Sequence, residues 1–131
     1  MTERELLILL RNRIPFLSQI PDGIFFNLDT SEFYLPDDEI SAARADLEQK
    51  LNHYVMTYKL GILNLDIPVE RHLCANLRPA QLTEDQLMVL RDFEEKYGSR
   101  RVSFVVYQNP LVLIDPFESD MHKLYVKRGR I

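Results

Sequence analysis

Histidine and cysteine are the side chains of this sequence best suited to metal or nucleophilic chemistry. His72 and Cys74 form an H-x-C pair, and His53 and His122 lie elsewhere in the chain. Zinc motifs need paired ligands at defined spacing, and a catalytic thiol needs a nearby histidine in an electropositive setting. An isolated H-x-C pair indicates neither. We therefore expect no metal site and no enzyme, with a small hydrolase based on Cys74 as an alternative.

Carboxylates gather at two points of the sequence. The first group is Asp37, Asp38 and Glu39, and the second is Asp115, Glu118 and Asp120. Acid–base or Mg²⁺ chemistry requires carboxylates that converge on a cleft from different elements. The first group instead suits the start of a helix, where capping oxygens and negative charge are favoured, and the second suits a turn around Pro116. Glycine-rich nucleotide-binding motifs are absent, so we expect no cofactor.

The C-terminal end of the sequence is basic. Residues 1–98 carry 17 acidic and 10 basic side chains, whereas residues 99–131 carry 3 and 6. Lysines and arginines around Tyr125 suit contact with phosphates and stacking on a base, although they also suit a solvated edge strand. These basic residues are Lys123, Lys127, Arg128 and Arg130. Because the net charge is −4, weak nucleic-acid binding is an alternative and not the main expectation.

Two apolar stretches predict a surface that binds another protein. Residues 6–10 read LLILL, so apolar side chains point all round the first expected helix, whereas a surface helix normally keeps a polar face. Residues 51–60 read LNHYVMTYKL and contain one methionine and two tyrosines, which are adaptable contact residues. The candidate contact residues are Leu6, Leu9, Tyr54, Met56 and Tyr58. Complete burial of these side chains is the alternative.

Capping patterns and apolar spacing predict three helices. Capping boxes begin at Thr2 and Thr83, Gly61 can close the second helix in a left-handed turn, and Gly98 can end the third. The long central helix has a stripe of apolar residues at helical spacing. That stripe consists of Ile40, Ala43, Leu47, Leu51, Tyr54, Val55 and Tyr58. The expected helices cover residues 3–13, 38–61 and 84–98.

Alternating apolar, β-branched and aromatic residues predict strands between and after these helices. The expected strands cover residues 24–28, 32–35, 63–69, 101–108, 111–115 and 121–127. Short connections favour antiparallel neighbours. The sequence therefore predicts an α+β fold, with a mostly antiparallel sheet of five to six strands on which two long helices and an N-terminal helix pack.

Size and composition limit the class of protein. A chain of 131 residues with 46% hydrophobic and 27% charged residues suits one globular domain over residues 1–131. No apolar run reaches the roughly 20 residues that cross a membrane, no signal-peptide pattern is present, and a single cysteine suits the cytoplasm.

We expect a non-enzymatic protein-binding module, such as an assembly factor, dedicated chaperone or adaptor, whose acidic surroundings steer a basic or mixed partner. It is also a candidate homodimer through the first helix. A structural subunit of a phage or virus type of assembly is an alternative.

Overall fold

The computed structural model of the chain describes residues 1–127, apart from the side chain of Lys127. Arg128 and Arg130 of the basic end lie outside the described residues. The described part contains six α-helices and one antiparallel sheet of two strands. The predicted α+β class is confirmed, but the predicted sheet of five to six strands is wrong.

The sheet joins two segments that lie far apart in the sequence. Strand β1, Tyr54–Lys59, pairs with strand β2, Val102–Tyr107, so that Tyr54 lies opposite Tyr107. Both strands are rich in β-branched and aromatic residues, which suit a pleated and partly buried surface. Isolated bridges from Phe33 to β1 and from Pro79 to β2 cover part of the two outer edges. The strand predicted over residues 101–108 is confirmed.

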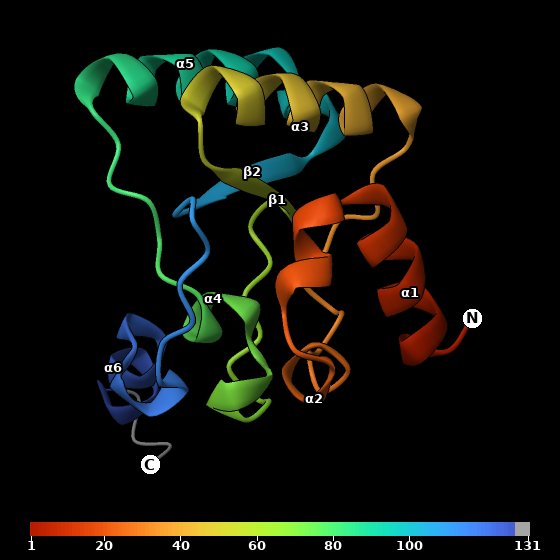
Figure 1. Ribbon diagram of the computed structural model, residues 1–131, viewed down its shortest axis with the longest axis vertical. Coiled ribbons are helices and arrows are strands. Elements are labelled where there is room, and N and C mark those ends of the chain that lie inside the picture. The colour runs from red at the N-terminus through yellow and green to blue at the C-terminus, as the bar shows by residue number, and fades with distance from the viewer. Residues whose placement is uncertain (128–131) are drawn as a thin grey trace.

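Two helices cover one face of the sheet, α3 (Asp38–Leu51) and α5 (Glu84–Lys96), which lie side by side in Figure 1. The side chain of Asp37 caps α3 by accepting a hydrogen bond from the Ile40 amide at 3.0 Å. Thr83 forms the predicted capping box of α5. The core between these helices and the sheet contains Ile40, Leu47, Leu51, Val55, Val102, Phe104 and Val106.

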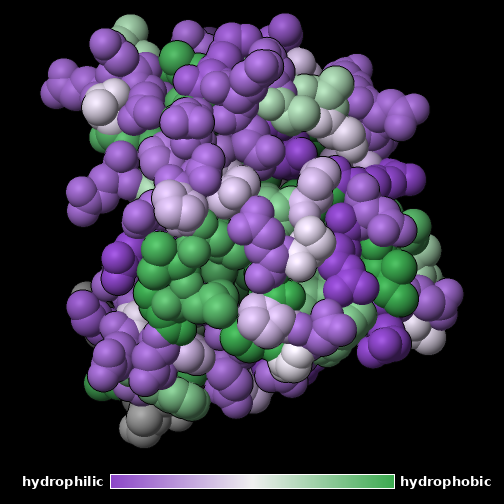
Figure 2. Space-filling model, in the orientation of Figure 1, coloured by the Kyte–Doolittle hydropathy of each residue, from purple (hydrophilic) through white to green (hydrophobic). Residues whose placement is uncertain are grey.

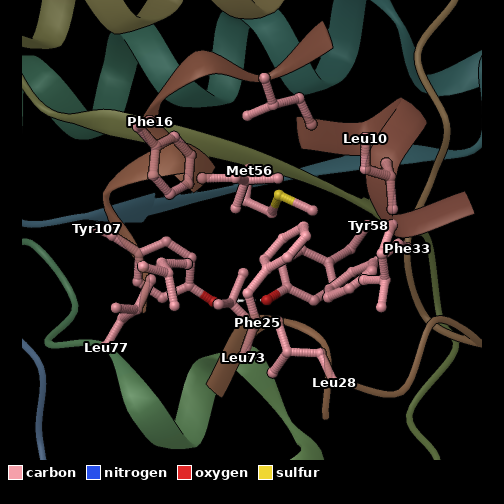
Figure 3. Close-up of a cluster of buried hydrophobic side chains, with 14 residues drawn as sticks. Leu10, Phe16, Phe25, Leu28, Phe33, Met56, Tyr58, Leu73, Leu77 and Tyr107 are labelled. Carbon is pink, nitrogen blue, oxygen red and sulfur yellow. Dashed lines mark hydrogen bonds between the residues drawn. The ribbon is translucent and has the colours of Figure 1, made fainter. Parts of the chain in front are cut away.

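The remaining helices lie on the opposite side of the sheet (Figure 1). They are α1 (Glu3–Arg13), α2 (Asp22–Phe25), α4 (Leu73–Asn76) and α6 (Asp120–Lys127). Short 3₁₀ turns η1 (Pro15–Gln19), η2 (Val69–Arg71), η3 (Gly98–Arg100) and η4 (Pro116–Glu118) connect the elements. The predicted first helix and its capping box at Thr2 are confirmed. Figure 3 shows the main core of this side, where Phe16 and Met56 lie close to Tyr58 and Tyr107.

The long central helix predicted over residues 38–61 is too long. Helix α3 stops where Asn52 adopts a left-handed backbone conformation with a φ of 55°. Tyr54, Val55 and Tyr58 continue the helical spacing of the apolar stripe by coincidence, because they belong to β1. A β-branched and aromatic run after an asparagine was the signal for this change of structure.

Five of the predicted strands are wrong. They were expected over residues 24–28, 32–35, 63–69, 111–115 and 121–127. The first consists of the end of α2, at Ile24 and Phe25, and the turn that follows it, and the second makes only the bridge from Phe33 to Tyr58. The fourth makes only a bridge from Leu113 to Leu77. The first two segments bring several apolar side chains each to the core, among them Phe25, Leu28 and Phe33, without forming a ladder of strand pairs.

The last of these segments is helix α6. The Ser119 hydroxyl accepts a hydrogen bond from the His122 amide at 3.2 Å, as a residue before a helix does. Met121 and Tyr125 are one helical turn apart and both are buried. They form a small core with Leu65, Val69 and Ala75. Residues 63–69, which were also expected to form a strand, instead form turns that bury Leu65 and Val69 in this core.

Candidate functional site

The predicted contact residues do not form one exposed surface. Met56 has no exposed area and Tyr58 is buried, and both belong to the main core. Leu6 is half-buried against the same core, and Leu9 is also half-buried. Tyr54 is half-buried and stacks on Phe16 at 5.2 Å between ring centroids. Burial in the core therefore accounts for the apolar character of residues 54–58.

A pair of tyrosines lies at the centre of that core. The hydroxyl groups of Tyr58 and Tyr107 are 2.6 Å apart, and Figure 3 shows them pointing toward one another from β1 and β2. Burial raises the pKa of both phenols well above the usual range. Each hydroxyl satisfies the other, which lets two polar groups occupy an apolar interior.

A buried network around His72 links three segments of the chain. The imidazole Nδ1 lies 2.9 Å from a carboxylate oxygen of Glu32, and Nε2 lies 3.0 Å from the hydroxyl of Tyr125. The side chains of His72 and Glu32 are both buried. The network holds α6 against α4 and against the segment that precedes α3. The sequence did not single out Glu32, and it indicated Tyr125 only as a residue that could stack on a base, because the proximity of both to His72 depends on the tertiary fold.

Cys74 does not have the surroundings of a catalytic thiol. Burial and the charge of Glu32 raise the pKa of the Cys74 thiol to about 12. Both ring nitrogens of His72 already have partners in Glu32 and Tyr125, so neither nitrogen is free to accept a proton from the Cys74 thiol. A high pKa leaves almost no thiolate near neutral pH, and the thiolate is the nucleophilic form.

Native Cys74 should react slowly with thiol reagents. At pH 7.5 we expect labelling by an aromatic disulfide to be at least about 100-fold slower than labelling of the chain unfolded in urea, because the raised pKa suppresses the thiolate. The absorbance of the released thiol measures both rates. Labelling of the native protein at the rate of the unfolded chain would contradict the high pKa.

The other predicted groups are dispersed. Among the described residues, no three histidine, cysteine or acidic side chains come together as metal ligands. His53 lies by the polar turn after β2, where its Nδ1 accepts a hydrogen bond from the Asn109 amide at 3.2 Å. His122 lies in α6 beside the ring of Phe117.

Both groups of carboxylates have local structural roles. Asp37 and Glu39 pair with Arg100, and the hydrogen bond from the Ile40 amide, followed by that from Arg100, lowers the pKa of Asp37. Asp115 accepts a hydrogen bond from the Phe117 amide at 2.9 Å in the turn around Pro116. These contacts confirm the capping and turn functions predicted for Asp37 and Asp115.

The described part of the basic end does not form a strand. Lys123 is exposed on α6 and pairs with Asp120 at 3.3 Å. Tyr125 is buried and contacts His72, so its ring is not exposed for stacking on a base. None of the helices in residues 1–127 combines the length and the apolar character needed to cross a membrane.

An exposed apolar groove crosses the side of the sheet opposite α3 and α5. Two adjoining hollows, of about 360 and about 400 Å³, share Cys74 and Val105 in their walls. We call them together the apolar groove, and its apolar lining includes Ile62, Leu63, Cys74, Val105, Ile114 and Leu124. Figure 2 shows apolar side chains gathered on one face of the molecule, below the layer of α3 and α5 and over α4.

The turn after β1 forms one end of the apolar groove. Gly61 adopts a positive φ of 77°, which L-amino acids with a side chain rarely adopt. Ile62 is 50% exposed and Leu63 is 53% exposed. The sequence analysis placed Leu63 in a strand and left Ile62 between that strand and a helix ending at Gly61, so the exposure of both residues was missed. A glycine between apolar residues was the available signal for an apolar turn.

A larger polar hollow adjoins the apolar groove. We call this hollow, of about 660 Å³, the polar pocket; it is lined by His53, Arg78, Pro79, Ala80, Gln81, Gln108 and Asn109. Arg78 and Pro79 also line the apolar groove, so the two hollows share a wall.

Comparison of the chain with protein-family models, with curated proteins and with solved structures found no match.

Proposed function

We propose that this chain is a non-enzymatic protein-binding module whose binding surface is the apolar groove. The observation that supports this proposal most is the exposure of Ile62 and Leu63 beside the partly covered Val105, in a hollow that these residues line together. Assembly factors, dedicated chaperones and adaptors are proteins with such surfaces. The cytoplasm is the proposed compartment, because its reducing conditions suit a single free cysteine.

The energetics favour an occupant for this groove. A partner that buries exposed apolar side chains gains a free energy of roughly 25 cal/mol for every Å² of apolar surface removed from water. A hollow with apolar walls and a polar rim is the usual form of a site that receives side chains from a partner. The groove replaces the surface of Tyr54, Met56 and Tyr58 that the sequence predicted, since Met56 and Tyr58 are buried.

The charges beside the exposed turn are positive. Lys59 and Arg101 line a hollow together with Leu60 and Ile62. The exposed charged residues at this end of the groove are therefore basic, in contrast to the acidic surroundings expected from the net charge of −4. Glu32 also lines this end, but its side chain is buried and pairs with His72. Local cations of this kind raise the association rate of a partner segment with negative charge.

Peptide selection on the purified chain tests this proposal. A random peptide library displayed on phage is selected on the wild-type chain, and the affinities of the selected peptides are measured by calorimetry. We expect the double variant Ile62→Asp, Leu63→Asp to lose at least about 30-fold in affinity, because two charges replace apolar contacts. The matched control is Met88→Asp, at a methionine that is 60% exposed on α5, and it should bind as the wild type does.

Two results would contradict the proposal. One is equal binding of the selected peptides by the wild-type chain and by the double variant, with both folded by circular dichroism. The other is concentration-dependent self-association of the wild-type chain that the double variant abolishes, which would assign the groove to a second copy.

A further inference from the structure

We propose that the polar pocket binds a carboxylate side chain of the partner segment whose apolar residues occupy the apolar groove. This inference rests on the proposed function and specifies the partner: a polypeptide segment in which an aspartate or glutamate is close to apolar residues. Arg78 is the residue that connects the two sites, because it lines both the polar pocket and the apolar groove.

Arg78 is held in place by its backbone while its side chain is exposed. The Arg78 amide donates a hydrogen bond to the Val112 carbonyl at 2.9 Å, and its carbonyl accepts one from the Gln108 amide at 3.0 Å. The guanidinium group forms no ion pair with another residue in the described part of the chain. A guanidinium group offers five donors in a planar fork that fits a carboxylate. Arg78 therefore supplies both charge and geometry for a carboxylate.

The rest of the polar pocket adds donors and no competing acid. The side chains of Gln81, Gln108 and Asn109 supply amide groups, and no carboxylate is among the described residues that line the pocket. His53 Nδ1 accepts the Asn109 amide proton, so the neutral ring carries its own proton on Nε2 and that atom is a donor. A site with a cation and several donors, in a chain whose net charge is −4, favours an anion locally.

The distribution of charge along the groove disfavours an acid of the partner on the side of α6 and favours one in the polar pocket. Glu118 and Asp120 line the apolar groove on the side of α6 and would repel a carboxylate there. The polar pocket adjoins the groove at Arg78 and Pro79 and has no acidic residue in its described lining. It also extends beyond Arg78 to Gln81 and Asn109, which leaves room for the partner chain to continue. For this reason the acid is assigned to a side chain and not to a chain terminus.

A small-molecule titration tests the pocket without any partner. N-acetyl-glutamate methylamide is titrated into the labelled chain and followed by NMR, with N-acetyl-glutamine methylamide as the neutral probe. We expect saturable shifts at the side-chain amides of Gln81 and Gln108, with a dissociation constant on the order of 10 mM. Arg78→Gln should weaken this binding at least about tenfold, whereas Arg91→Gln on the exposed side of α5 should leave it unchanged.

Equal shifts with the glutamine probe, or unchanged binding by Arg78→Gln, would overturn the carboxylate assignment. The peptide selection gives a second test. Peptides selected on the wild-type chain should contain an acidic residue next to apolar residues, and changing that acid to its amide should weaken binding about tenfold to the wild type but not to Arg78→Gln. Peptides that depend on Ile62 and Leu63 but not on Arg78 would overturn this inference and leave the proposed function in place.

Discussion

Met56→Ala is expected to lower the free energy of unfolding by about 3 kcal/mol, because it removes a buried side chain and leaves a cavity. Met56 has no exposed area and lies in the core shown in Figure 3, on the strand β1. The transition is measured by urea denaturation followed by circular dichroism. In the long helix predicted from the sequence, Met56 lies off the apolar stripe, and its truncation would then have little effect on folding.

Met88→Ala is the matched control for this measurement. Met88 is 60% exposed on helix α5, so the same change of side chain should alter the free energy of unfolding by less than about 0.5 kcal/mol. If Met56→Ala lowered the free energy of unfolding no more than Met88→Ala does, residues 54–59 would not form the buried strand β1. A large loss at Met56 alone would support the sheet and the burial of the residues once expected to bind a partner.

Glu32→Ala is also expected to cost about 3 kcal/mol. The carboxylate of Glu32 lies 2.9 Å from Nδ1 of His72, and both side chains are buried. Removing one partner of a buried polar pair leaves the other without its hydrogen bond in a region that water does not reach. Glu32→Gln keeps an acceptor for the imidazole, so we expect a loss of about 1 kcal/mol from that variant.

Glu3→Ala is the control for the loss of a glutamate from an ion pair. Glu3 pairs with Arg71 at 2.7 Å but is 42% exposed, so its removal should cost less than about 1 kcal/mol. Glu32→Gln has a further readout. Because the charge of Glu32 helps to raise the pKa of Cys74, native Cys74 should be labelled faster in this variant than in the wild type. Equal costs for Glu32→Ala and Glu3→Ala would contradict the buried network.

The sequence predicts best the elements whose ends are marked by specific side chains. Thr2 and Thr83 begin α1 and α5 with capping boxes, and Asp37 caps α3. These signals act within one helical turn, so they are independent of the tertiary structure. The strand β2 was also predicted, because its residues alternate between two apolar faces over a length typical of strands.

The wrong elements are those whose pattern fits two structures. Tyr54, Val55 and Tyr58 match the spacing of a helix and also the composition of a strand, and the pairing with β2 decides between them. Met121 and Tyr125 were assigned to a strand by composition, yet their spacing of four residues places both on the buried side of α6. Local composition does not reveal which distant segment a residue will contact.

The candidate site was the least predictable part of the molecule. Ile62 and Leu63 are ordinary apolar residues in the sequence, and only the fold shows that no helix covers them. Arg78 and His53 are 25 positions apart and meet at the polar pocket because the segment around Pro79 runs beside β2. Sites that combine separate elements in this way leave no local signal in a single sequence.

The order of the strands in the chain has a consequence during synthesis on the ribosome. Residues 54–59 are made well before residues 102–107, so the only sheet of the described chain waits for its second strand. Until then, Met56 and Tyr58 are exposed on a nascent chain with an unpaired strand edge, a state prone to aggregation. A slow stretch of translation before Val102 would prolong that vulnerable interval.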